Sequence, residues 1–167
     1  MKKVFIAAIM YLSVLTTNTF AEVKMGIILG FTGPIESLTP AMAASAELAF
    51  KEASDSGSLL GGEKIKPIRA DSTCVDSAAA TTAAEGLVSQ GVAAIMGADC
   101  SGVTGAIASN VAVSNGIVMI SPSATSPGLT TLDDKGLFFR TAPSDARGGQ
   151  TVAYTHIRAH ETPMYLV

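Results

Sequence analysis

Short apolar runs alternate with alanine-rich segments along most of this chain, and this alternation constrains the fold more than any other feature of the sequence. Four runs predict buried strands and a looser run predicts a fifth, at residues 23–29, 65–71, 92–96, 117–120 and 137–141. Helices are expected between the first four, at 39–55, 77–90 and 103–114. Strands that alternate with helices pair in parallel, because each helix carries the chain back to the edge where the previous strand began.

The order of these elements predicts an α/β fold in which helices cover both faces of an open parallel sheet. Pro67 lacks the N–H that a central strand needs for its hydrogen bonds, so the strand at 65–71 is expected at a sheet edge. That placement fits the flavodoxin-like strand order 2-1-3-4-5. The first helix is expected to begin with Thr39 as its N-cap, to have Pro40 at its first position, and to stop at Gly57.

The first 21 residues have the three parts of a secretory signal peptide. Two lysines supply positive charge, residues 4–15 are apolar, and a short polar stretch ends at Ala21. A membrane anchor is the alternative, but this apolar run is well below the roughly 20 residues that cross a bilayer. We therefore expect residues 1–21 to be removed, a folded unit over 22–150, and a divergent tail over 151–167.

The charge of the chain limits which partners it can bind, and its cysteine content bears on the redox state of its compartment. Lys and Arg number 11 against 14 Asp and Glu, and no basic patch stands out, so nucleic acid is not an expected partner. Cys74 and Cys100 are the two cysteines, and such a pair in an exported chain favours a disulfide. Two buried free thiols are the alternative.

The loops that follow the predicted strands are nearly uncharged and rich in Gly, Ser and Thr. Three of them are the segments 30–34, 97–102 and 121–127. In open α/β sheets, ligands bind outside the carboxyl ends of the strands, where such loops meet. Their hydroxyl and backbone N–H groups suit a small polar ligand, and a loop that leads into a helix favours an anion such as a carboxylate.

Enzyme motifs fail in these loops, so no catalytic activity and no cofactor are expected. Segment 97–102 has the glycine spacing of a phosphate loop, but Val103 stands where that loop needs lysine. The first loop lacks the glycine pattern of a dinucleotide site. Asp99 stands two residues before Ser101, where the nucleophile elbow of a serine hydrolase has glycine.

Histidine occurs only near the C-terminal end of the sequence, at His156 and His160. The two are four residues apart and precede Glu161, which makes a weak metal-like cluster. We interpret this cluster as part of a solvated tail and expect no bound metal. The body of the chain holds no histidine that could act as a general base in hydrolysis.

Several segments together resemble one protein family. They are Gly33-Pro34, the Asp-Ser-Thr-Cys run at 71–74, Cys100-Ser101, the Ile-Ser-Pro-Ser-Ala-Thr-Ser-Pro run at 120–127, and the segments 139–141 and 145–147. From residue 25 to about residue 150, the chain resembles the leucine/isoleucine/valine-binding proteins of ABC importers, which are type I substrate-binding proteins of the periplasm. The cysteine pair and the 120–127 run together make the resemblance specific.

The resemblance implies a role in ligand binding for five residues. Ser101 and Thr125 resemble the hydroxyl residues that hold the α-carboxylate of the ligand, and Ser123 matches the position whose carbonyl accepts from the α-ammonium group. Ala124 lies beside Ser123 in the same turn, and Leu38 falls at a position near the ligand side chain. For each hydroxyl, a helix cap or turn residue without ligand contact is the alternative.

The resemblance further implies that the protein is the periplasmic solute-binding component of an amino-acid ABC importer. Its partners would be an amino acid, most simply an aliphatic one, and the membrane permease; the chain itself would not be embedded in the membrane. Family members carry a second lobe that closes over the ligand, so one lobe is expected to bind weakly or not at all. A sensory module of the same fold, a binder of amides, urea or aromatic acids, and an exported enzyme are the alternatives.

Overall fold

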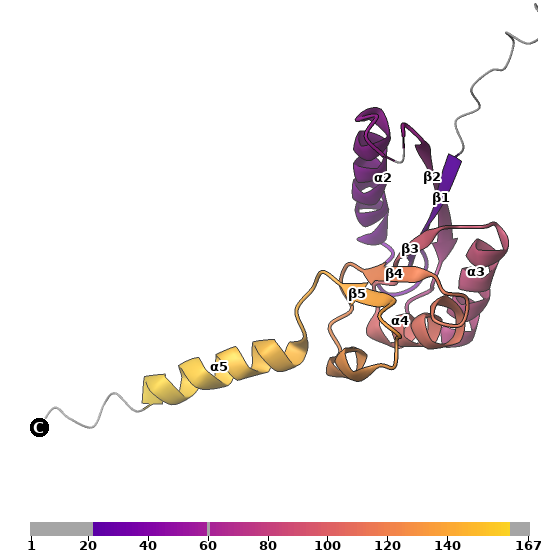
Figure 1. Ribbon diagram of the computed structural model, residues 1–167. Helices are drawn as coiled ribbons and strands as arrows, with labels where there is room; N and C mark the ends of the chain where they lie inside the picture. The colour runs from indigo at the N-terminus through magenta and orange to yellow at the C-terminus, as the bar shows by residue number, and fades with distance from the viewer. Residues whose placement is uncertain (1–21, 60, 161–167) are drawn as a thin grey trace, which may run out of the picture.

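Five parallel strands form the centre of the molecule (Figure 1). The computed structural model describes residues 22–59 and 61–160, with side chains up to residue 156. The strands are β1 (Glu22–Leu29), β2 (Lys64–Asp71), β3 (Ala94–Gly97), β4 (Val118–Ser121) and β5 (Phe138–Arg140). They lie in the order β2-β1-β3-β4-β5, which confirms the predicted fold class and strand order. The expected signal peptide at 1–21 lies outside the described residues.

Helices lie on both faces of the sheet, as predicted. On one face α2 (Thr39–Asp55) packs against β1 and β2. On the other face α3 (Ser77–Ser89) lies against α4 (Ser101–Ile107) (Figure 1). The chain continues from α4 into a π-helical turn, η1 (Ala108–Ala112), and a 3-10 turn, η2 (Pro127–Thr131), joins β4 to β5.

The apolar core is divided between the two faces of the sheet. Consecutive residues of a strand point to opposite sides, so Ile28 packs with Leu87, Ile95 and Met119 on the α3 side, whereas Ile27 packs on the α2 side. Each of these five side chains is at most 1% exposed. Burying an aliphatic side chain of this size contributes about 1.5–3 kcal/mol, so β1 is fixed between the two helical layers.

The edge position of β2 follows from its proline. Pro67 lies opposite Met25 in the register of β1 and β2, and β2 has β1 as its one neighbour in the sheet. The side of β2 that faces away from β1 therefore needs no ladder hydrogen bonds, and a residue without an N–H is tolerated there. This confirms the predicted edge strand.

Two helix starts differ from the prediction: α4 begins at Ser101 rather than at residue 103, and α2 has a different N-cap. Leu38 rather than Thr39 occupies the N-cap position of α2, and no side chain caps that end. The Thr39 hydroxyl is buried and donates instead to the carbonyl of Gly30 at 3.0 Å, which ties α2 to the end of β1. α3 does have a side-chain cap, because Asp76 accepts from two backbone amides of its first turn.

A further helix, α5 (Asp145–His160), follows β5 and projects away from the sheet (Figure 1). A tail was expected beyond residue 150 and no helix was predicted here, and the expected boundary at Gln150 falls inside α5. The side chains of α5 are exposed as far as His156, including Val152 and Tyr154. Across residues 22–59 and 61–160, no helix is both long and apolar enough to cross a membrane.

Candidate ligand-binding site

The carboxyl ends of four neighbouring strands bring the predicted binding loops to one edge of the sheet. Gly30 follows β1, Ser72 follows β2, Ala98 follows β3 and Pro122 follows β4. All four strands run in parallel, so these loops meet at a common edge. Open α/β sheets bind their ligands at this edge.

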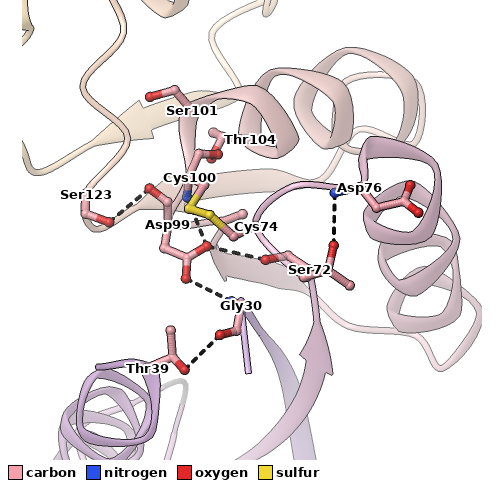
Figure 2. The surroundings of a disulfide bond; sticks show 12 residues. Gly30, Thr39, Ser72, Cys74, Asp76, Asp99, Cys100, Ser101, Thr104 and Ser123 are labelled. Atoms are coloured by element: carbon pink, nitrogen blue, oxygen red, sulfur yellow. Dashed lines mark hydrogen bonds between the residues drawn. A yellow bond between two sulfur atoms is a disulfide. The ribbon is translucent and has the colours of Figure 1, made fainter. Parts of the chain in front are cut away.

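A disulfide joins two of these loops and confirms the predicted pairing. Cys74, in the loop after β2, is bonded to Cys100, in the loop after β3, with a Cα–Cα distance of 5.2 Å (Figure 2). Thr73 and Cys74 both have left-handed backbone conformations, with φ of 56° and 68°. The bond therefore fixes a tightly turned loop directly beside Ser101, the first residue of α4.

Ser101 and Thr125, the two residues predicted to hold a carboxylate, lie next to each other. The Ser101 Oγ accepts hydrogen bonds from the backbone N–H groups of Thr125 and Ser126, each at 3.1 Å. Both Ser101 and Thr125 are half-buried. The serine hydroxyl thus connects the loop after β3 to the loop after β4, which the sequence places 24 residues apart.

The turn after β4 is fixed by its own serines. The Ser121 hydroxyl donates to the carbonyl of Ala98 at 2.5 Å and accepts from the N–H of Ala124 at 3.0 Å. The Ser123 hydroxyl donates to the carbonyl of Asp99 at 3.0 Å. Ala124 is fully buried, so its methyl group anchors this turn in the core.

Arg140 supports the same turn and was not among the predicted site residues. Its Nη1 donates to the carbonyls of Ser126 at 2.8 Å and Ala124 at 3.4 Å, and its Nη2 donates to the Thr130 hydroxyl at 2.5 Å. A guanidinium group presents several donors in a rigid plane and so can hold a turn through its carbonyls. The available signal was a charged residue near the end of the predicted strand at 137–141.

The remaining predicted residue, Leu38, lies at the start of α2. The Thr39–Gly30 hydrogen bond places this end of α2 at the edge that carries Ser101. The Leu38 side chain is 62% exposed, unlike most large apolar side chains of the chain. Its role toward a ligand stays a prediction.

Asp71 joins the loops after β1 and β2. Its carboxylate accepts from the Thr32 hydroxyl at 2.6 Å and from the Thr73 N–H at 2.8 Å. Burial raises the pKa of Asp71, but the hydrogen bonds from Thr32 and Thr73 outweigh burial, so the pKa lies below its ordinary value. The charged form of Asp71 therefore stabilises this part of the edge.

Metal binding finds no support in the described residues, among which no group of three or more His, Cys, Asp or Glu side chains is placed to hold a metal ion. The weak cluster at the C-terminal end is untested, because the side chain of His160 and all of Glu161 lie outside the described residues. The donors at the sheet edge are hydroxyl groups and backbone amides, which suit a polar organic ligand better than a metal.

An open parallel sheet with this strand order and a hydroxyl-lined carboxyl edge defines one lobe of a type I substrate-binding protein. Comparison with known proteins agrees with this class. The family described as periplasmic binding protein matches residues 22–167, and the chain belongs to that family.

Curated relatives and solved structures are similar to this chain over most of its length. It is 37% identical to the Leu/Ile/Val-binding protein homolog 1 of Brucella abortus over 145 residues, covering 86% of this chain and 37% of the relative. An ABC transporter substrate-binding protein from Desulfitobacterium hafniense in complex with Leu has a TM-score of 0.68 at 28% identity, with 83% and 39% covered.

A third similar protein was solved with an aromatic acid. It is the solute-binding protein of an ABC transporter from R. palustris in complex with benzoate, with a TM-score of 0.71 at 26% identity, covering 84% of this chain and 38% of that protein. The present chain thus spans less than two fifths of the length of these relatives. The shared region is the N-terminal lobe.

Proposed function

We propose that this protein is the extracytoplasmic, periplasmic solute-binding component of an ABC importer for branched-chain amino acids, with residues 22–150 as its N-terminal lobe. Its partners are then an aliphatic amino acid and the membrane permease, and its task is capture without chemical conversion. The observation that carries the proposal is the contact of the Ser101 hydroxyl with the backbone of Thr125. The relatives with Leu/Ile/Val in their names support it.

The geometry suits a carboxylate. The Ser101 Oγ already accepts two hydrogen bonds, so its hydroxyl proton remains as a donor toward the sheet edge. The Thr125 hydroxyl lies in the adjoining loop and supplies a second donor of the same kind. Hydrogen bonds to an ionised acceptor are roughly twice as strong as neutral ones, so two hydroxyl groups favour a carboxylate over an amide.

An aromatic acid is the second candidate ligand, because one of the similar proteins was solved with benzoate. Leucine and benzoate share a carboxylate and differ in the group attached to it. The Ser101–Thr125 pair is proposed to bind what the two have in common. Selection between leucine and benzoate then depends on the residues that surround the rest of the ligand, and Leu38 is the candidate for this role in this lobe.

The proposal is tested by nuclear magnetic resonance of the ¹⁵N-labelled protein, because this method detects weak binding and locates it. Leucine and benzoate are titrated separately into the millimolar range, and leucinamide serves as the control that lacks a carboxylate. We expect the amide signals of Ser101, Thr125 and Ser126 to shift with leucine and much less with leucinamide. Equal shifts with leucine and leucinamide would contradict the proposal.

Substitution of Ser101 by alanine provides the first mutational test. Loss of a hydrogen bond to a charged group costs about 1.5–3 kcal/mol, so Ser101→Ala and Thr125→Ala should each weaken leucine binding by about tenfold or more. Ser114→Ala is the matched control, since its exposed hydroxyl follows η1, at the opposite end of the sheet. Unchanged affinity in both site variants would refute the assignment of these residues.

A further inference from the structure

We infer that Asp99 is the positioning residue that sets the spacing of the binding loops, an inference that rests on the proposed function of this edge. Asp99 follows β3 and is only 4% exposed. A carboxylate is rarely buried to this degree unless it is paired or hydrogen-bonded. Its contacts therefore indicate what the residue does.

The carboxylate of Asp99 accepts from three groups on three loops (Figure 2). Its Oδ2 accepts from the N–H of Gly30 at 2.8 Å, which reaches the loop after β1. Its Oδ1 accepts from the Ser72 hydroxyl at 3.3 Å, after β2, and from the N–H of Cys100 at 2.9 Å, next to Ser101. One side chain thus connects the ends of three strands.

The backbone of Asp99 extends the connection to the fourth strand. Its carbonyl accepts from the Ser123 hydroxyl at 3.0 Å, in the turn that carries Thr125. On the other side, the carbonyl of Gly30 accepts from the buried Thr39 hydroxyl at 3.0 Å, so α2 joins the same network. The network therefore runs from the start of α2 to the turn after β4 (Figure 2).

The disulfide and the Ser101 hydroxyl do not make Asp99 redundant. The disulfide joins the loops after β2 and β3, and Ser101 joins the loops after β3 and β4. Asp71 joins the loops after β1 and β2, and Asp99 adds the direct link from the loop after β1 to the loop after β3, through Gly30. It also fixes the amide of the residue before Ser101. The donors of Ser101 and Thr125 are consequently held in place before any ligand arrives.

An asparagine at this position tests the inference, because it keeps the shape of the side chain and replaces one acceptor oxygen with an NH₂ donor. Whichever way the amide is turned, one of the two backbone N–H groups, of Gly30 or of Cys100, then faces a donor. We expect Asp99→Asn to weaken leucine binding about tenfold or more while α3 remains folded. Asp133→Asn, at an exposed position, removes the same charge and should leave binding unchanged.

A second measurement separates this inference from the proposed function. Hydrogen exchange of the Thr125 and Ser126 amides should accelerate about tenfold in Asp99→Asn without change at Leu87 in α3, whether or not leucine binds. If leucine and leucinamide shift the amide signals of the unsubstituted protein equally, the proposed function fails, and exchange still decides the role of Asp99. Unchanged exchange at both amides, or unchanged leucine affinity in a protein that binds, would overturn the inference.

A milder variant is available if Asp99→Asn does not fold. Ser72→Ala removes one of the three donors to the Asp99 carboxylate and leaves both backbone bonds in place. The same amides should then exchange faster, with an increase of about two- to threefold. No increase in this folded variant would also contradict the positioning role.

Discussion

At the scale of single residues, the binding edge depends on groups that accept more than one hydrogen bond. Ser101 accepts from two amides and Asp71 from a hydroxyl and an amide, and each contact crosses from one loop to another or closes a turn. An acceptor shared in this way holds two chain segments with one side chain. Substitution of one such residue by a side chain without an acceptor is therefore expected to loosen two loops together.

Gly33 gives the first prediction at this scale. Its φ is +95°, and a Cβ added there would lie 2.4 Å from the carbonyl oxygen of Thr73. Gly33→Ala should therefore lower the free energy of unfolding by about 2 kcal/mol or more, from the left-handed backbone and the clash together. Gly57, with φ +66° and no heavy atom within 4 Å of such a Cβ, is the control and should lose about 1 kcal/mol. Equal losses in urea unfolding would contradict the prediction.

Asp71 gives a prediction about pH. Its pKa is lower in the folded protein than in the unfolded chain, so its contribution to stability is present above the ordinary pKa and is lost as the pH falls through the folded value. Between pH 6 and pH 3, Asp71→Asn should therefore lose less unfolding free energy than the unsubstituted protein does.

The control for this measurement is Asp133→Asn, which removes an exposed carboxylate. Glu47 also has a lowered pKa, because it hydrogen-bonds with Arg69, so part of the acid sensitivity should survive in Asp71→Asn. Equal losses between pH 6 and pH 3 in Asp71→Asn and the unsubstituted protein would show that Asp71 does not contribute in this way.

At the scale of helices and strands, the hydrophobic pattern predicted the sheet and its order. The apolar runs are strands within a few residues of their expected bounds, because a buried parallel strand needs a continuous apolar run. The predicted N-cap of α2 was wrong, because the sequence cannot show that the Thr39 hydroxyl donates to the carbonyl of Gly30 instead of capping the helix. α5 was missed because its glycines and threonines have low helix propensity.

The candidate site was predicted in part. The loops at the carboxyl ends and the cysteine pair follow from strand order and composition, whereas Ser101 and Thr125 were singled out by the family resemblance, and the structure brings these two residues together. The contacts of Asp99 and Arg140 did not follow, because each depends on backbone groups of distant loops. Such contacts have no periodicity or spacing that a sequence pattern could reveal.

Adjacent phenylalanines in β5 allow a matched test of the two faces of the sheet. Phe138 is 8% exposed and packs in the core on the α3 side, whereas Phe139, on the other face, is 53% exposed. Phe138→Ala should therefore lower the unfolding free energy by about 3–5 kcal/mol, and Phe139→Ala by less than about 1 kcal/mol. Urea unfolding of both variants checks this, and similar losses would contradict the assignment of their faces.

At the scale of the whole molecule, the two sides of the sheet are covered unequally. α3, α4 and η1 pack over one side, while Ile120 and Phe139 remain exposed on the side where α2 covers β1 and β2. All-parallel sheets are normally covered on both faces. The lobe therefore has one well-packed side and one side that is packed mainly under α2.

Hydrogen exchange should distinguish the exposed helix α5 from the packed helix α3. The side chains of α5 are exposed as far as His156, whereas α3 buries Ala80, Ala84 and Leu87. Helices with few buried apolar contacts open locally at low free energy, so the α5 amides should exchange at least about a hundredfold faster than those in the middle of α3. Similar protection in the two helices would contradict the prediction.

The disulfide has a consequence for how the protein matures. Cys100 directly precedes Ser101, so oxidation is the step that gives the Ser101 loop its covalent support. Before that step the loop is held by hydrogen bonds alone. In a reducing compartment thiols stay reduced, and in an oxidising one they pair. In an oxidising compartment the chain therefore gains a covalent link beside Ser101 that it lacks in a reducing one.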